Sequence, residues 1–101
     1  TWVANASVVV RVNAVPVLVD VEPDTLCLSL AATRRALSPR TRAISVVHLY
    51  GSMADMDGFR ALADEAGVGL IEDCSHVHGA MWRDARAGSF GDIGVFSMQQ
   101  T

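Results

Sequence analysis

Short apolar runs alternate with polar turns along most of the chain. Three of these runs are mostly apolar and rich in β-branched residues, at 16–21, 43–47 and 68–71. This pattern is typical of strands that are buried on both faces. A fourth run, at 93–97, predicts a last short strand.

Helices are predicted between these strands. Ser29 can cap a helix whose apolar positions share one face and which ends at residues 38–40. Asp55 or Asp57 can cap a second helix, which Gly67 ends. The apolar positions are Leu30, Ala31 and Leu37 in the first helix and Phe59, Leu62, Ala63 and Ala66 in the second.

The first apolar stretch, residues 5–13, suits a strand almost as well as a helix, and we interpret it as a short buried helix. A turn follows the strand at 16–21, and a glycine-rich loop covers residues 79–91. Alternating buried strands and helices predict an α/β fold with three layers, a mostly parallel sheet with helices on both faces, joined by right-handed crossovers.

Composition narrows the class of protein. Half of the 101 residues are hydrophobic and 19% are charged, which is too apolar for a disordered chain. A chain of 10.8 kDa is too short for a complete enzyme of this kind, so one lobe of a larger fold is expected. The chain begins without methionine and stops inside a motif-like stretch, so we expect both ends to be cuts.

Charge, hydropathy and cysteine content indicate the binding partners and the cellular location to expect. The net charge is −3 and the basic residues, all arginine, are scattered, so no nucleic-acid partner is expected. The apolar runs are far shorter than the roughly 20 residues of a membrane span, so no membrane is expected either. Two cysteines are too few for a disulfide scaffold, and a cytoplasmic location fits best.

Polar residues follow several predicted strands, where ligands bind in parallel sheets. Asp20 and Glu22 follow one strand, His48 and Tyr50 another, and the densest group is 72–76. Asp73 in that group can hold a cationic ring nitrogen through a charge-assisted hydrogen bond. Its ordinary alternative is a turn cap.

A metal site is the main alternative. Cys74, His76 and His78 are spaced by two, so an extended segment would place them on one face. Zinc sites usually join a close pair of ligands to a distant pair, and only His48 could supply the distant ligand. The ordinary interpretations are a turn with a surface histidine and a small buried cysteine.

Two further features have weak signals on their own. The glycines of residues 88–94 lead into an apolar run rather than a helix, which excludes a nucleotide loop. Ser97 ends that run, where its hydroxyl could bind a phosphate oxygen. Trp2 could stack on a planar ligand, although core packing is the ordinary role of such a residue.

Taken together, the motifs at 1–4, 48–51 with 55–57, 72–79 and 91–101 resemble, in order and spacing, the DegT/StrS-type sugar aminotransferases. These are pyridoxal 5'-phosphate (PLP) enzymes of fold type I. The resemblance covers essentially the whole chain and implies that residues 1–101 are a fragment of the PLP-binding large domain. The sequences of residues 73–79 and 97–101 are most similar to those of family members that aminate keto-cyclitols in the biosynthesis of aminoglycoside antibiotics.

The resemblance also implies roles for matching residues. Asp73 would pair with the pyridinium nitrogen and His76 would lie by the phenolic oxygen of the cofactor. Trp2 would stack on its ring and Ser97 would bind its phosphate. The Schiff-base lysine would be residue 102, one position beyond the chain, so the chain alone is expected to be inactive.

The implied reaction moves the amino group of L-glutamine to a keto-cyclitol, in a full-length protein that is expected to be a homodimer. Family members with histidine at the lysine position dehydrate sugars instead. An aminotransferase or dehydratase for nucleotide-linked keto-sugars is therefore one alternative, and a small metal-binding α/β module is another.

Overall fold

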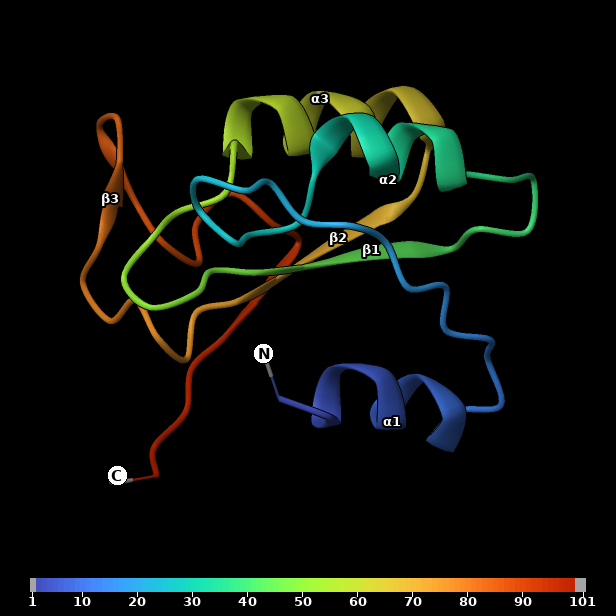
Figure 1. The fold of residues 1–101 in the computed structure, drawn as a ribbon, viewed down its shortest axis with the longest axis horizontal. Coiled ribbons are helices and arrows are strands. Elements are labelled where there is room, and N and C mark those ends of the chain that lie inside the picture. The colour runs from blue at the N-terminus through green and yellow to red at the C-terminus, as the bar shows by residue number, and fades with distance from the viewer. Residues whose placement is uncertain (1, 100–101) are drawn as a thin grey trace.

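The computed structural model describes residues 2–99, with the elements arranged in three layers (Figure 1). The central sheet has three parallel strands in the order β1-β2-β5. Helices α2 and α3 cover one side of it and α1 lies on the other (Figure 1). The expected α/β architecture is therefore confirmed. The elements are α1 (Ala4–Arg11), α2 (Leu30–Ala36), β1 (Ala43–Val47), α3 (Met56–Ala66), β2 (Gly69–Asp73), β3 (Met81–Trp82), β4 (Ala85–Arg86) and β5 (Ile93–Val95).

The predicted caps of α2 and α3 are confirmed. Ser29 accepts a hydrogen bond from the N–H of Ala32, and Asp55 accepts one from the N–H of Gly58. Gly67 ends α3 in the left-handed conformation, at φ 66°. These contacts satisfy backbone groups that a helix end leaves unpaired, which is why both helices begin, and α3 ends, where they do. Helix α2 ends at Ala36, before the expected residues 38–40.

The main core lies between the sheet and α3. Its largest members are fully buried side chains from α3 and from the strands β1 and β2. Burial of each such side chain contributes about 1.5–3 kcal/mol. The core therefore fixes β1 and β2 side by side, and with them the polar residues at their carboxyl ends. The largest apolar members are Met56, Phe59, Leu62, Leu70 and Val46.

Two sequence expectations are wrong. The first helix forms at Ala4–Arg11, but none of its residues is buried. Residues 16–20 form no strand, and Val17 and Leu18 are exposed; only Val21 pairs, in an isolated bridge with Leu28. An apolar run becomes a buried strand only where a neighbouring strand pairs with it, and among the described residues the backbone pairing of 16–20 is limited to the carbonyl of Asp20, which accepts from the N–H of Ser29.

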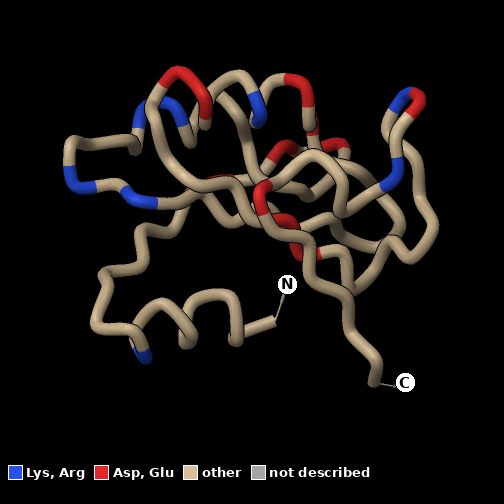
Figure 2. Tube along the Cα trace, turned by 180° about the vertical axis from the view of Figure 1, so that it is seen from behind, with Lys and Arg blue, Asp and Glu red and all other residues tan. Residues whose placement is uncertain are grey.

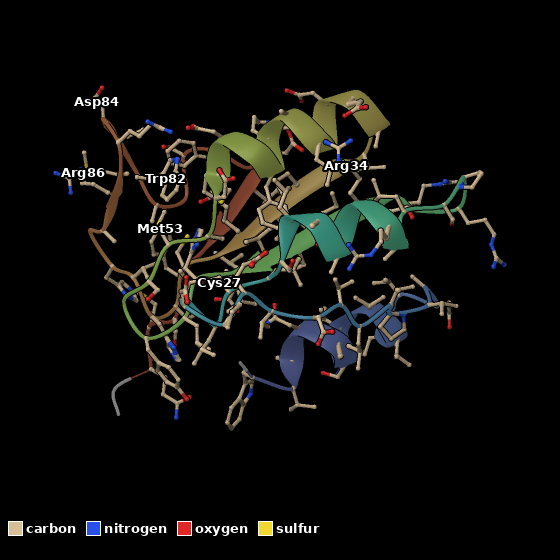
Figure 3. All side chains as sticks on the ribbon, turned by 45° about the horizontal axis from the view of Figure 1, so that its top comes forward. Cys27, Arg34, Met53, Trp82, Asp84 and Arg86 are labelled. Atoms are coloured by element: carbon tan, nitrogen blue, oxygen red, sulfur yellow. The ribbon has the colours of Figure 1, made fainter. Side chains whose placement is uncertain are left out.

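Two other expectations need smaller corrections. The glycine-rich loop contains a short antiparallel hairpin of β3 and β4, with Asp84 at its tip and Trp82 turned toward the core (Figure 3). The last strand ends at Val95 rather than at residue 97. Charged residues gather over α2, α3 and this hairpin, whereas residues 4–19 carry only Arg11 (Figure 2). No helix within residues 2–99 is long and apolar enough to cross a membrane.

Candidate active site

A cavity of about 610 Å³ opens beside the carboxyl ends of β1 and β2. This volume is in the range of small-molecule sites, and the position is where ligands bind in parallel sheets. The four residues to which the family resemblance assigns cofactor roles line the cavity together: Trp2, Asp73, His76 and Ser97. They come from parts of the chain up to 95 residues apart in sequence, so the fold brings them together.

Asp73, the last residue of β2, is half-buried in the cavity wall. Its Oδ2 accepts a hydrogen bond from Asn5 Nδ2 at 2.8 Å, and its Oδ1 accepts one from the N–H of Ser75 at 3.1 Å. Burial alone would raise the pKa of Asp73, but these hydrogen bonds and the nearby His76 hold it below its ordinary value. The carboxylate is thus ionised at neutral pH and retains free lone pairs.

Ser97 lies just beyond β5, on the side of the cavity next to His78. Its carbonyl accepts a hydrogen bond from His78 Nε2 at 3.0 Å, and its Oγ accepts one from the N–H of Gln99 at 3.1 Å. The hydroxyl proton is not used in either contact. Ser97 can therefore donate to an anionic oxygen in the cavity.

Trp2 and His76 line the cavity with exposed side chains. Trp2 is 75% exposed, so the ordinary interpretation of this residue as part of the core is wrong. His76 stacks on Tyr50, with the ring centroids 5.4 Å apart and the planes 19° from parallel. An open aromatic face and an imidazole on one cavity suit a flat, polar ligand.

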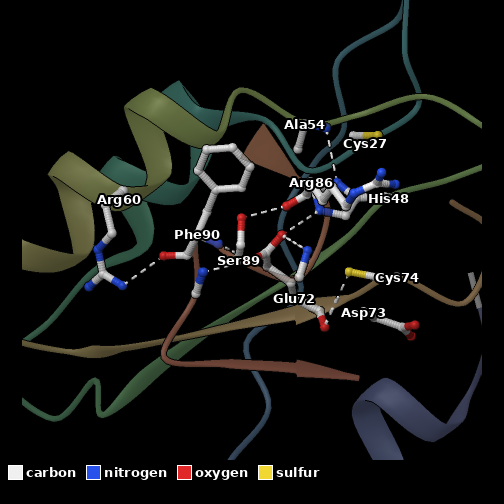
Figure 4. Close-up of polar contacts among 12 residues, drawn as sticks. Cys27, His48, Ala54, Arg60, Glu72, Asp73, Cys74, Arg86, Ser89 and Phe90 are labelled. Atoms are coloured by element: carbon white, nitrogen blue, oxygen red, sulfur yellow. Dashed lines mark hydrogen bonds and ion pairs between the residues drawn. The ribbon is translucent and has the colours of Figure 1, made fainter. Parts of the chain in front are cut away.

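Glu72 lies one position before Asp73 and is fully buried on the opposite side of β2 (Figure 4). Its carboxylate accepts hydrogen bonds from the N–H groups of Gly88, Phe90 and Gly91 at 2.6–2.9 Å and from His48 Nε2 at 3.1 Å. Burial alone would raise the pKa of Glu72, but these hydrogen bonds outweigh burial and lower it. The charge of Glu72 fixes the glycine-rich loop to β2.

His48 completes this buried cluster. Its Nδ1 accepts a hydrogen bond from the N–H of Ala54 at 3.1 Å, so the ring proton lies on Nε2 and is donated to Glu72. Both ring nitrogens are thus engaged. The cluster ties the segment after β1 to the end of β2, and His48 is itself among the residues that line the cavity.

The structure does not bring the predicted metal ligands together. Residues 74–79 form turns rather than an extended segment, and Cys74 is fully buried whereas His76 and His78 are exposed and line the cavity. Within residues 2–99, the group with metal-ligand spacing is His48, Glu72 and Cys74. The two nitrogens of His48 and both oxygens of Glu72 already make hydrogen bonds, while burial and the two neighbouring carboxylates raise the pKa of the Cys74 thiol to about 12. This cluster is a hydrogen-bond network and does not suit a metal.

Sequence reasoning missed two residues of the site and over-interpreted two others. Asn5 holds Asp73 but stood in a run interpreted only as helix, and its amide among apolar residues was the available signal. Glu72 was noted only as part of a polar group, although a glutamate that ends an apolar strand before a glycine-rich loop signals a buried anion. Among the described residues, Asp20 and Glu22 are not part of the cavity lining.

Fold and cavity define an α/β protein with a parallel central sheet and a cavity of small-molecule size at the carboxyl edge of that sheet. The family model described as the DegT/DnrJ/EryC1/StrS aminotransferase family matches residues 1–101. The chain belongs to this aminotransferase family.

The relatives of this chain include two curated aminotransferases. The chain is 59% identical over 101 residues to an L-glutamine:2-deoxy-scyllo-inosose aminotransferase of Micromonospora echinospora, covering 100% of this chain and 24% of that protein. It is 56% identical over 99 residues to an L-glutamine:scyllo-inosose aminotransferase of Streptomyces griseus, covering 98% of this chain and 23% of that protein. The chain thus spans about a quarter of the length of the curated relatives it matches.

Solved structures agree with the fold. A 3-amino-5-hydroxybenzoic acid synthase superimposes with a TM-score of 0.93 at 39% identity, covering 98% of this chain and 26% of the other. An aminotransferase of Psychrobacter cryohalolentis superimposes with a TM-score of 0.93 at 40% identity, covering 95% of this chain and 24% of the other. The expected architecture, a part of a larger aminotransferase fold, is confirmed.

Proposed function

We propose that the protein to which this chain belongs is a PLP-dependent aminotransferase that moves the amino group of L-glutamine to a keto-cyclitol, 2-deoxy-scyllo-inosose or scyllo-inosose, in aminoglycoside biosynthesis. The observation that carries the proposal is the 59% identity, over all 101 residues, to an L-glutamine:2-deoxy-scyllo-inosose aminotransferase. The full-length protein is proposed to act as a homodimer in the cytoplasm.

The side chains around the cavity suit PLP. Asp73 offers an ionised carboxylate with free lone pairs, which a protonated ring nitrogen requires. Trp2 offers an open aromatic face for a flat ring, and Ser97 offers a free hydroxyl proton for a phosphate oxygen. We assign these three residues to binding the cofactor and His76 to its phenolic oxygen.

Bound PLP supplies an electron-withdrawing ring that stabilises negative charge on the carbon that loses a proton. Asp73 keeps the ring nitrogen protonated, because an anion beside a cationic nitrogen raises the pKa of that nitrogen. Each unit of that shift represents about 1.4 kcal/mol in favour of the protonated form. Asn5 and Ser75 hold the carboxylate in place, so Asp73 needs no rearrangement when a ligand enters.

Turnover by the full-length protein tests this proposal. The purified protein is supplied with PLP, L-glutamine and 2-deoxy-scyllo-inosose, and the amino-cyclitol product is measured by mass spectrometry with 15N-amine glutamine as donor. We expect the 15N label in the cyclitol. A matched reaction with a nucleotide-linked keto-sugar tests the second acceptor class. Transfer to the keto-sugar alone would contradict the cyclitol assignment, and transfer to neither would contradict the proposed function.

A further inference from the structure

A strained turn joins the end of β1 to the site. Ser52 donates its N–H to the carbonyl of Leu49 at 2.8 Å, and the two residues between them, Tyr50 and Gly51, have φ values of 50° and 85°. Positive φ at both central positions is typical of type I′ turns, which favour Asn, Asp and Gly. A bulky residue such as tyrosine rarely adopts this conformation.

Core packing does not explain why a tyrosine occupies this strained position. The Tyr50 side chain is 76% exposed, so it contributes little to the core. Among the described residues it is also absent from the lining of the cavity. Leu26 and Arg83 also have positive φ, but Tyr50 is the one of these residues that contacts a side chain lining the cavity, which motivates a functional hypothesis for its conformation.

In this conformation Tyr50 makes two contacts with the side chain of His76. The backbone N–H of Tyr50 donates to Nδ1 of His76 at 3.3 Å. The phenol ring stacks on the imidazole, with the centroids 5.4 Å apart. A nitrogen that accepts a hydrogen bond carries no proton, so the proton of the neutral ring lies on Nε2. His76 lines the cavity beside Asp73, so this second nitrogen is the one left to bind a ligand.

We infer that Tyr50 is a positioning residue for His76: its left-handed backbone and its ring hold the imidazole as the Nε2–H tautomer, a hydrogen-bond donor toward an anionic oxygen of the ligand. This inference rests on the proposed function for the identity of the ligand. The tautomer itself follows from the contacts between the turn and the ring.

The test measures the tautomer in the full-length protein without cofactor. The protein is labelled with 15N-histidine, and the two ring nitrogens of His76 are identified by comparison with His76→Gln. We expect an unprotonated Nδ1 and a protonated Nε2 in the 15N spectrum of the neutral imidazole, which is recorded at about pH 9. A protonated Nδ1 in the neutral ring would overturn the inference before any variant of Tyr50 is made.

Three variants separate the effect of the Tyr50 backbone conformation from the effect of its aromatic ring. Tyr50→Phe keeps the stacking and the turn, and should keep both the tautomer and turnover. Tyr50→Asn loses the ring but tolerates positive φ, so it should keep the tautomer. Tyr50→Val loses the ring and disfavours positive φ, so it should give a mixture of tautomers and lower kcat about 3- to 10-fold, as expected for one neutral hydrogen bond.

Each result decides the question. An unchanged tautomer in a folded Tyr50→Val, or equal loss in the Asn and Val variants, would overturn the positioning role. If the Val variant does not fold, the wild-type spectrum and the Asn variant still decide it. Failure of the proposed function would appear differently, as absence of amine transfer by a wild-type protein whose His76 shows the expected tautomer.

Discussion

Two adjacent carboxylates of β2 have opposite environments. Glu72 is fully buried and accepts four hydrogen bonds, three from the glycine-rich loop and one from His48. Asp73 is half-buried, accepts hydrogen bonds from Asn5 and Ser75, and faces the cavity. Figure 4 shows the two side chains pointing apart.

The difference between Glu72 and Asp73 shows how one strand can stabilise the fold with one face and line the cavity with the other. Successive side chains of a strand point to opposite faces, so Glu72 and Asp73 cannot share partners. Hydrogen bonds lower the pKa of both. Glu72 has a donor for each main lone-pair direction, while Asp73 retains acceptor capacity for a ligand. We therefore expect changes at Glu72 to affect stability and changes at Asp73 to affect chemistry.

The largest effect is expected for Glu72→Gln. The amide cannot accept at both atoms, so buried N–H groups of the glycine-rich loop lose their partner. We expect the free energy of unfolding of the full-length protein to fall by about 3 kcal/mol or more, measured by urea denaturation. Glu65→Gln on the surface of α3 is the matched control and should cost less than about 1 kcal/mol. Equal losses in the two variants would contradict the comparison.

Asp73→Asn should spare stability and affect turnover. A neutral amide cannot keep a ring nitrogen protonated, so kcat of the full-length protein should fall about 100-fold or more. Cofactor binding and the urea midpoint should change little. Asp84→Asn, at the tip of the hairpin, is the control and should behave as wild type (Figure 3). Near-normal turnover of Asp73→Asn would remove this residue from the proposed role.

Acid should destabilise the protein partly through Glu72. Because its pKa is lower in the folded state, its stabilising contribution is complete above the ordinary value of 4.5 and is lost as the pH falls through the lowered value. Glu72→Gln lacks this contribution at every pH. The difference in stability between wild type and Glu72→Gln should therefore shrink between pH 6 and pH 3; a constant difference would show that the charge of Glu72 does not matter.

Trp2→Ala should weaken retention of PLP by the full-length protein. Stacking contributes about 0.5–1.5 kcal/mol beyond area burial, which corresponds to about a 2- to 10-fold rise in Kd. Trp2→Phe should recover part of the loss. Cofactor absorbance during dialysis is the measurement, and an unchanged Kd in the alanine variant would exclude the stacking role.

The smallest effect concerns Cys74. Its thiol is buried, and its pKa is raised to about 12, so it should stay unmodified by iodoacetamide in the folded protein at pH 8. Unfolding in urea should make it reactive, which mass spectrometry of the peptide detects. Rapid modification in the folded state would indicate a thiolate and would revive the metal interpretation.

Much of this arrangement could be predicted from the sequence because local signals and the fold agree. The caps at Ser29 and Asp55 correctly predicted where α2 and α3 begin, and Gly67 where α3 ends. The rule that polar residues gather at carboxyl ends of parallel strands led to Asp73 and His76. The resemblance added Trp2 and Ser97, and all four line one cavity, although their roles toward a cofactor remain predictions.

The rest depended on partners that sequence spacing does not show. The run at 16–21 has strand composition, yet among the described residues only Val21 finds a bridge partner. Asn5 meets Asp73 across 68 positions, and Glu72 meets the loop across 16–19 positions. Such long-range polar contacts depend on tertiary packing, so local patterns could indicate an unusual residue but could not name its partner.

The alternation of Glu72 and Asp73 makes the alignment of β2 critical. β2 pairs with β1 so that Asp73 lies opposite Val47, and Gly67 in its left-handed conformation sets where the strand begins. A slip by a single position would exchange the faces of the two carboxylates. Insertion or deletion of one residue between α3 and β2 would therefore bury the Asp73 carboxylate. It would also leave the N–H groups of the glycine-rich loop without the Glu72 carboxylate.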